Sequence, residues 1–373
     1  MYYDVGALVA MQEGCPVLLQ SEVGVHQCDP LGPALFALTI HPSLVNLQNI
    51  YPEIQALAYL DDVFLVGAPT DVINAFNCLS VCLQELGLNI RHDKCDLYCP
   101  DLNISIPDCP VPVKFDGIAI LGLPIGTANF VSSYCSSFAD SGNCLCDQLV
   151  ALNDVQSASL LLRYCHVPRL NHLATTVCPS LLSETTEIHD LQTRSVFFNL
   201  LSYDHLSDSV WWQASLPIRL GGFGLSSVKS VSPCAFLASW VQALVCLLIR
   251  FPNLKSFIDS FLASPSEFPT GIVLSSLIPA ASKLSDYLPE NNKLQKKLSS
   301  ELAESLLSNV LKASVSMRDA ARFCSLTSKG AGAWISAVPS SACFTIDSCV
   351  YRSLGVEAEV RFAGLLIRMV KIM

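Results

Sequence analysis

Two short apolar runs, Ala56–Leu60 and Val63–Gly67, meet at the adjacent carboxylates Asp61 and Asp62. Apolar runs of this length that are separated by two polar residues are typical of the strands of a β-hairpin. The pattern therefore predicts a hairpin of two apolar strands that closes on an Asp-Asp turn.

A helix is predicted directly after this hairpin, over Asp71–Leu88. Its apolar residues recur at spacings of three and four, and Gly87 lies where a helix would end; these residues are Val72, Phe76, Leu79, Leu83 and Leu86. Gly117–Thr127 is a further strand-and-turn segment with several glycines. Such alternation of strands and helices predicts an α+β fold for residues 1–127.

The chain after residue 128 has a helical pattern. Leucine-rich periodicity predicts helices in Ser157–His166, Arg169–Thr176, Glu184–Leu201 and Asn292–Lys312. A loop rich in proline and glycine, Leu216–Leu225, separates the earlier helices from the later ones. We therefore expect an all-helical region over 128–215 and a second helical region over 216–373.

Composition and charge limit the functions that the chain can have. Hydrophobic residues make up 51% of it and charged residues 14%, which indicates a folded core and not disorder. The net charge of −10 argues against a generally basic surface for nucleic acid, although a local strip of cations would suffice. The one lysine cluster lies on the Asn292–Lys312 helix and is favoured as a solvated face over a phosphate contact; it consists of Lys293, Lys296, Lys297 and Lys312.

The seventeen cysteines are scattered, and no Cys-x-x-Cys pair occurs. Together with an N-terminus that lacks the features of a signal peptide, this predicts an intracellular protein with reduced thiols buried as small apolar residues. Cys234–Ile249 is apolar but contains Gln242 and is shorter than the about 20 residues that a membrane span needs. We expect a buried helix there and no membrane.

The chemistry of the Asp61–Asp62 pair is the clearest functional signal in the sequence. Two adjacent carboxylates repel each other unless a cation lies near them. Mg²⁺ prefers oxygen ligands and commonly takes one or two carboxylates together with phosphate oxygens of a substrate. The alternative is that Asp-Asp occurs here because aspartate favours turns.

A second polar segment precedes the hairpin. Gly24–Pro33 reads GVHQCDPLGP and is followed by the apolar run Ala34–Leu38. Proline suits the first turn of a helix, so this segment predicts a strand end, a turn and the start of a helix. Gly32 has no side chain and would let a base or nucleotide approach closely. The alternative is an ordinary loop-to-helix junction.

Together these segments resemble the reverse transcriptase family, in the form found in non-LTR retrotransposons. The family has Gly-Val-x-Gln-Gly-Asp-Pro-Leu-x-Pro before a Tyr-x-Asp-Asp turn, which matches Gly24–Pro33 and Tyr59–Asp62 almost completely. Further segments resemble the family in order: 87–95, 120–126, 162–165 with 168–173, 216–217 with 221–225, and 330–334. The resemblance implies a partial fingers and palm region over 1–127, in which the palm is an antiparallel sheet with packed helices. It further implies an all-helical thumb-like region over 128–215 and a helical C-terminal connection over 216–373.

The resemblance also implies roles for individual residues. Asp61 would be a direct metal ligand and Asp62 a weaker or indirect one, with Tyr59 under the nucleotide or the primer end. Gln27 and the backbone from Pro30 to Gly32 would form the platform for template and nucleotide. The implied cofactor is a pair of Mg²⁺ ions, and the implied partners are an RNA template, a DNA primer and deoxynucleotides.

Lys94 would donate a proton to the departing pyrophosphate or stabilise its charge. A surface lysine that closes a turn is an equally plausible interpretation. The remaining histidines show no spacing that pairs them as metal ligands, so structural or surface roles are expected; they are His41, His166, His172, His189 and His205.

Two departures from the family pattern bear on activity. Cys28 stands where the family has a glycine beside Gln27, and Asp4 is the sole aspartate in the short stretch before Gln27. The family's first catalytic aspartate belongs to a strand farther upstream, so Asp4 is not assigned that role. The sequence therefore favours a partial polymerase, inactive as this chain. The alternatives are a catalytically dead remnant and a domesticated protein that binds nucleic acid or protein. Host, insertion target and oligomeric state are left open.

Overall fold

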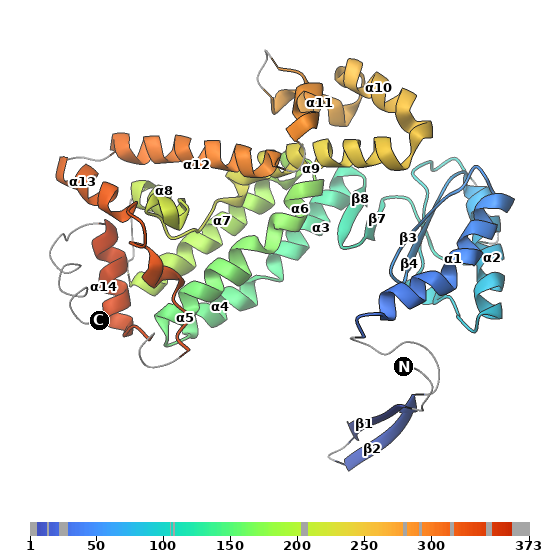
Figure 1. Cartoon of the computed structure of the whole chain (residues 1–373), viewed down its shortest axis with the longest axis horizontal. Helices are drawn as coiled ribbons and strands as arrows, with labels where there is room; N and C mark the ends of the chain where they lie inside the picture. Colours follow the sequence, from blue (N-terminus) through green and yellow to red (C-terminus); the bar gives the residue numbers. More distant parts are fainter. Residues whose placement is uncertain are drawn as a thin grey trace. The chain divides into compact units, whose positions relative to one another are not determined.

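A computed structural model shows the architecture of the chain (Figure 1). It describes residues 6–12, 15–21, 29–104, 106, 109–202, 208–278, 282–290, 293–313, 317–340 and 345–359. The chain divides into two compact units, Met1–Ile118 and Ala119–Met373. The first contains strands and helices, and the second is almost entirely helical, which agrees with an α+β protein.

The first unit begins with an antiparallel hairpin, β1 (Gly6–Gln12) and β2 (Cys15–Ser21). A second hairpin, β3 (Gln55–Tyr59) and β4 (Asp62–Val66), lies between helices α1 (Gly32–Ile50) and α2 (Pro69–Glu85) in the sequence. Side chains alternate between the two faces of a strand, and one face of β3–β4 packs on both helices. That face and the helices form a small core, which includes Leu47, Ile54, Ala56, Val63, Leu65, Ala75 and Leu79.

Helix α2 confirms the prediction made from the periodicity of Asp71–Leu88, although it starts earlier, at Pro69. Proline is favoured in the first helical turn because its missing N–H has no partner there. The C-terminal end is set by Gly87, which has φ +78. The amide of Gly87 donates to the carbonyl of Gln84 at 2.9 Å and that of Leu88 to Leu83 at 2.9 Å. These two bonds are the pattern by which a left-handed residue closes a helix.

The remaining strands are short. A parallel pair joins β5 (Leu97–Tyr98) to β6 (Val113–Lys114), and β7 (Gly117–Ile120) forms a hairpin with β8 (Leu123–Gly126) through Leu121 and Gly122. Among the described residues the strands form four separate two-stranded sheets. The expected antiparallel sheet with packed helices is therefore present only as β3–β4, since no described strand pairs with the outer edge of either.

Helices make up the second unit, and short 3-10 turns connect several of them. They are α3 (Ala128–Asp140), α4 (Asn143–Ala151), α5 (Val155–Leu161), α6 (Asn171–Thr176), α7 (Pro179–Leu201), α8 (Asp208–Ser215), α9 (Val228–Arg250), α10 (Lys255–Ala263), α11 (Pro269–Ser276), α12 (Leu294–Ala313), α13 (Met317–Leu326) and α14 (Ser348–Glu359). Helices are present in each of the four predicted segments. Two of them differ in part: Leu162–His166, the second half of Ser157–His166, is a π-helical turn (η2), and Arg169 and Leu170 belong to the 3-10 turn Val167–Leu170 that precedes α6. Asn292, the first residue of the segment Asn292–Lys312, lies outside the described residues.

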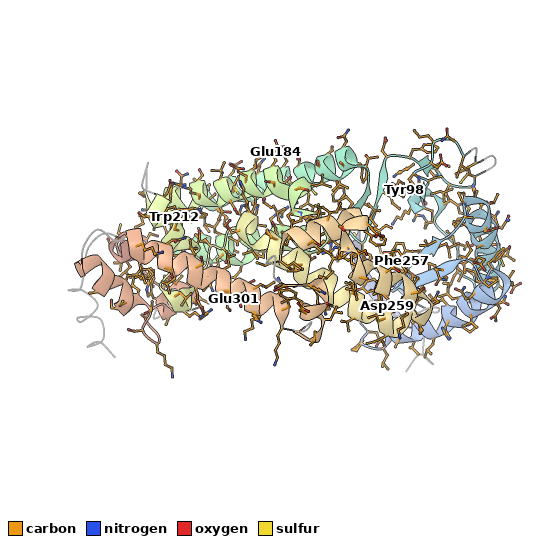
Figure 2. All side chains as sticks on the ribbon, turned by 90° about the horizontal axis from the view of Figure 1, so that it is seen from above. Tyr98, Glu184, Trp212, Phe257, Asp259 and Glu301 are labelled. Atoms are coloured by element: carbon orange, nitrogen blue, oxygen red, sulfur yellow. The ribbon has the colours of Figure 1, made fainter. Side chains whose placement is uncertain are left out.

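Helices α7 and α9 form the centre of this unit. Helix α7 packs against α3, α4 and α9, while α9 also packs against α6 and α12 (Figure 1). The carboxylate of Asp190 on α7 accepts bonds from the amides of Val228 and Lys229, at 2.9 and 3.2 Å, and from the Ser227 hydroxyl. Because the first amides of a helix have no partner within it, this carboxylate fixes the start of α9. Charged side chains such as Glu184 and Glu301 point outward (Figure 2).

Helix α9 contains the apolar stretch that the sequence singled out. By length and composition it could cross a membrane, with 39% of its apolar window buried, and it is the one such helix in the described part of the chain. Its buried side chains include Phe236, Val241 and Leu244, which pack with Ile258 and Phe261 of α10. The expected buried helix is therefore found in part: Ala235–Ala238 are buried, whereas Cys246 and Ile249 near its end are exposed.

The cysteines correct one expectation. The cysteines of the described residues are free thiols, but only Cys99, Cys135 and Cys146 are buried. Others, including Cys144, Cys165 and Cys246, are exposed. Cysteine therefore does not serve mainly as a small core residue here, because the helix faces that carry it are turned largely to solvent.

Candidate functional site

The tip of the β3–β4 hairpin carries the candidate metal ligands. Tyr59 pairs with Asp62 in the ladder, so the two-residue turn consists of Leu60 and Asp61. Leu60 has φ +55, a left-handed value that is uncommon for a residue with a side chain. The predicted Asp61–Asp62 turn is thus displaced by one residue. Asp61 occupies the turn, and Asp62 is the first residue of β4 because it already has a ladder partner.

All four residues of the tip, Tyr59 to Asp62, are exposed. Water therefore screens the repulsion between the two carboxylates, and a hydrated cation can reach both of them. Two carboxylates with water and phosphate oxygens are a ligand set that suits one Mg²⁺ ion. Among the described residues no group of three or more His, Cys, Asp or Glu side chains could hold a metal. The chemistry of this donor set fits one magnesium ion better than two.

Tyr59 and Asp62 share one face of the hairpin because they are ladder partners. The same face carries Leu57 and Phe64, which also pair, and it is the face opposite the helices. Leu57 and Tyr59 are 44% and 59% exposed and Phe64 is half-buried, so this face is largely open among the described residues. An aromatic ring and a carboxylate thus lie together on an open surface.

The predicted platform is only partly described. Gln27 and Cys28 lie outside the described residues. After them comes Asp29, whose side-chain carboxylate accepts a hydrogen bond from the amide of Leu31 at 2.9 Å. The backbone carbonyl of Asp29 accepts a hydrogen bond from the amide of Gly32 at 3.0 Å. This turn leads into α1 with Pro33 in the first helical turn, as the sequence predicted. Pro30 is exposed and Gly32 is buried.

Lys94 lies on a separate 3-10 turn, His92–Lys94, and is exposed. Its amide donates to the carbonyl of Arg91, whose guanidinium makes a two-bond ion pair with Asp93 at 2.8 and 2.6 Å. That guanidinium lowers the pKa of Asp93. No hydrogen bond or ion pair within residues 29–104 joins Lys94 to Asp61 or Asp62. The structure therefore brings Tyr59, Asp61 and Asp62 together but does not link Lys94 to them.

The second unit buries His166 and His189, a structural role of the kind that the sequence predicted, although it did not predict that the two pair. The rings of His166 and His189 stack with centroids 4.3 Å apart, and Cys146 Sγ lies 3.5 Å from His166 Nδ1. His189 Nε2 lies 3.4 Å from the carbonyl of Val167. Burial lowers the pKa of both imidazoles to about 4. Both are therefore neutral at neutral pH and act as packed core residues. Their positions on η2 and α7 give no spacing that could have revealed the pair.

A pocket of ≈ 290 Å³ also lies in the second unit. Its lining includes Arg163 and Tyr164 of η2, Asn171 of α6, and Gly224, Ser226–Val228 and Val231 around the start of α9. The guanidinium of Arg163 lies over the Tyr164 ring, 4.7 Å from its centroid, and donates to the Ser336 hydroxyl at 3.2 Å. The sequence had singled out 162–165 and 221–225 only as segments of family resemblance.

Two kinds of known protein sequence are similar to this chain. Residues 11–125 match the family described as reverse transcriptase (RNA-dependent DNA polymerase). The chain is also similar to the retrotransposable element SLACS 132 kDa protein of Trypanosoma brucei gambiense, at 35% identity over 78 residues. That similarity covers 21% of this chain and 7% of the SLACS protein. No solved structure matches the chain. The comparisons confirm the resemblance seen in the sequence: residues 11–125 are similar to the reverse transcriptase family, and 78 residues of the chain are similar to a retrotransposable element protein.

Proposed function

We propose that the β3–β4 hairpin is the metal- and nucleotide-binding tip of an RNA-directed DNA polymerase. Such an enzyme joins a primer 3′-hydroxyl to the α-phosphate of a deoxynucleotide and releases pyrophosphate. Asp61 and Asp62 would hold Mg²⁺, which when bound neutralises charge on the phosphate oxygens. The proposal is supported by the family match over residues 11–125, which contains the whole hairpin.

The observation that carries the proposal is the geometry of the tip. Asp61 is set in a two-residue turn, and Asp62 lies beside Tyr59 on the open face of the hairpin. A turn between two paired strands fixes the direction of its carboxylates better than a long loop could. Tyr59 would support the nucleotide or the primer end from the same face. Gln27, Pro30 and Gly32 would form the platform on the approach to α1, and Lys94 would protonate the departing pyrophosphate.

We further propose that this chain extends primers weakly or not at all by itself. The two carboxylates of the tip are exposed, so they compete with water for the cation and hold it loosely. A binding protein derived from a polymerase is the second candidate, and the Arg163 pocket is the observation that favours it.

Metal binding tests the first proposal. Tb³⁺ replaces hard divalent ions and luminesces when a nearby tyrosine is excited, and Tyr59 lies beside Asp62. We expect the full chain to show Tb³⁺ luminescence that Mg²⁺ competes away. The double variant Asp61→Asn/Asp62→Asn should need at least about tenfold more Tb³⁺, because both charged ligands are lost. Glu85→Gln, at an exposed acid on α2, is the matched control. If the double variant bound Tb³⁺ with the same affinity as wild type, Asp61 and Asp62 would not be metal ligands.

Primer extension tests the second proposal. The full chain is supplied with an RNA template, an annealed DNA primer, deoxynucleotides, and Mg²⁺ or Mn²⁺. We expect no templated extension above background. Templated incorporation that disappears in Asp61→Ala would show that the chain is an active polymerase, and it would leave the assignment of Asp61 intact.

A further inference from the structure

The pocket beside η2 has the chemistry of a site for an anion. Its lining contains Arg163, the Asn171 amide and the Ser226 and Ser299 hydroxyls, but no aspartate or glutamate. No carboxylate among the described residues forms an ion pair with Arg163. Arg163 instead donates to Ser336 and lies over the ring of Tyr164. Guanidinium groups that are held in this way present donors suited to a phosphate.

The local backbone holds Arg163 in place. Residues Leu162–His166 form a π-helical turn, a form that is rare and frequent at functional sites. On the facing loop, Gly224 has φ +74, and a Cβ there would lie 2.8 Å from Arg163 Nε. Glycine at 224 thus permits both the left-handed backbone and the close approach of the guanidinium.

A neighbouring carboxylate does not occupy this site. Asp190, behind Ser227, accepts the amides of Val228 and Lys229 and the Ser227 hydroxyl. Its charge is therefore compensated at the start of α9, where Lys229 also pairs with Glu187 at 2.7 Å. The pocket's own donors remain available to a ligand.

Tyr164 supplies a second recognition element. Tyr164 is 56% exposed although Arg163 lies over its ring, so a flat aromatic group can stack on it. A phosphate donor next to an exposed tyrosine is the combination by which proteins bind single-stranded nucleic acid: a cation contacts the backbone and an aromatic ring stacks on a base. The pocket volume of ≈ 290 Å³ is at the low end for small-ligand sites. It suits one nucleotide unit.

We propose that the Arg163–Tyr164 pocket binds a nucleotide unit of a single-stranded nucleic acid, with phosphate on Arg163 and base on Tyr164. This deepens the proposed function, since it adds a nucleic-acid contact in the helical unit. The pocket does not depend on the carboxylates of the hairpin. The net charge of −10 does not oppose this binding, because one nucleotide of a strand needs only one local positive group, which Arg163 supplies.

The test uses the full chain and a fluorescein-labelled 12-nucleotide single strand of mixed sequence, followed by fluorescence anisotropy in EDTA at several salt concentrations. Arg163→Gln should weaken binding about 5- to 10-fold and reduce the log–log salt slope by about 0.7, the value for one phosphate contact on a single strand. Tyr164→Leu should weaken binding about fivefold or more and leave the slope unchanged. Unlabelled deoxyadenosine monophosphate and the unlabelled oligonucleotide each compete with the labelled strand. Stronger competition by the oligonucleotide shows that the pocket prefers a strand to a free nucleotide.

Arg250→Gln is the matched control, because Arg250 is exposed and lies at the far end of α9, roughly 30 Å along the helix. It should change affinity less than twofold. The proposal is overturned if wild-type protein does not bind the strand, if Arg250→Gln weakens binding as much as Arg163→Gln, or if duplex DNA competes as well as the single strand. Asp61→Asn/Asp62→Asn should bind the strand normally, so failure at the hairpin and failure at this pocket are distinguishable.

Discussion

At the scale of single residues, Leu60 shows how the hairpin aims its carboxylates. A left-handed φ of +55 places a leucine where glycine or asparagine is normally found, and the next residue is Asp61. Such a conformation costs on the order of 1–3 kcal/mol and persists only where the surrounding structure enforces it. The five paired residues of each strand provide that enforcement, since the ladder from Gln55 to Tyr59 leaves two residues to reverse the chain.

Substitutions at Leu60 test this strain. Leu60→Val should lower the free energy of unfolding of the first unit by about 1–2 kcal/mol, because a β-branched side chain tolerates positive φ poorly. Leu60→Gly should be neutral or stabilising by up to about 1 kcal/mol, because glycine accepts this φ but gains freedom when unfolded. Both values come from urea unfolding, as the shift of the transition in tyrosine fluorescence that has no counterpart in tryptophan fluorescence, because the tryptophans lie in the second unit. Leu57→Val, at an exposed strand position, is the control and should differ from wild type by less than about 0.5 kcal/mol. A destabilising Leu60→Gly would mean that the turn is not strained.

The sequence predicted the position of the turn to within one residue. Apolar runs located the strands and the Asp-Asp pair located the reversal, but alternation alone could not tell that Asp62 has a ladder partner. That pairing depends on the register of the two strands, which is set by packing against other elements and not by the local sequence. The buried pair His166 and His189 was beyond sequence reasoning for the same reason, since it forms only when η2 packs on α7.

At the scale of elements, local signals fixed most helices. The repeats of four in Leu294–Val310 and the Gly87 stop after α2 were sufficient, because burial of one face and a left-handed end are local requirements. The π-helical turn of Leu162–His166 could not be predicted, because its residues continue the leucine pattern of α5. A π-turn forms where tertiary packing favours the extra residue over regular helix geometry.

Gly87 gives a quantitative test at this scale. A Cβ at Gly87 would meet nothing within 4 Å, and the residue has φ +78. Gly87→Ala should therefore destabilise the first unit by about 1 kcal/mol through backbone strain alone. Gly87→Asn should lose less, because asparagine enters the left-handed region more easily. Urea unfolding of the two variants provides the comparison. Equal stability of Gly87→Ala and wild type would show that the end of α2 frays and that its two closing bonds contribute nothing.

At the scale of the whole molecule, the two units differ in the groups that they bury. The second unit encloses two imidazoles, 0% and 2% exposed at His166 and His189, and it contains all four tryptophans, Trp211, Trp212, Trp240 and Trp334. The first unit buries a small apolar core without an ionisable side chain among Leu47, Ile54, Ala75 and Leu79. Tryptophan fluorescence therefore reports the second unit alone, and tyrosines such as Tyr51 and Tyr59 lie in the first.

This difference predicts an acid response confined to the second unit. Burial lowers the folded pKa of His166 and His189 to about 4 from the ordinary 6.5, so between these values the unfolded chain binds more protons. Stability is full above about pH 6.5 and falls as the pH is lowered towards 4. By pH 5 the loss of unfolding free energy should be on the order of 2 kcal/mol for each imidazole, at about 1.4 kcal/mol per pKa unit.

Urea unfolding followed by tryptophan fluorescence between pH 7.5 and 5 measures this loss, above the range in which most carboxylates titrate. The double variant His166→Gln/His189→Gln should show a much flatter profile, whereas His172→Gln, at an exposed histidine, should keep the wild-type slope. A flat wild-type profile would mean that these imidazoles gain protons without opening the core, and the stacked pair would then not be the dry, neutral contact that its burial indicates.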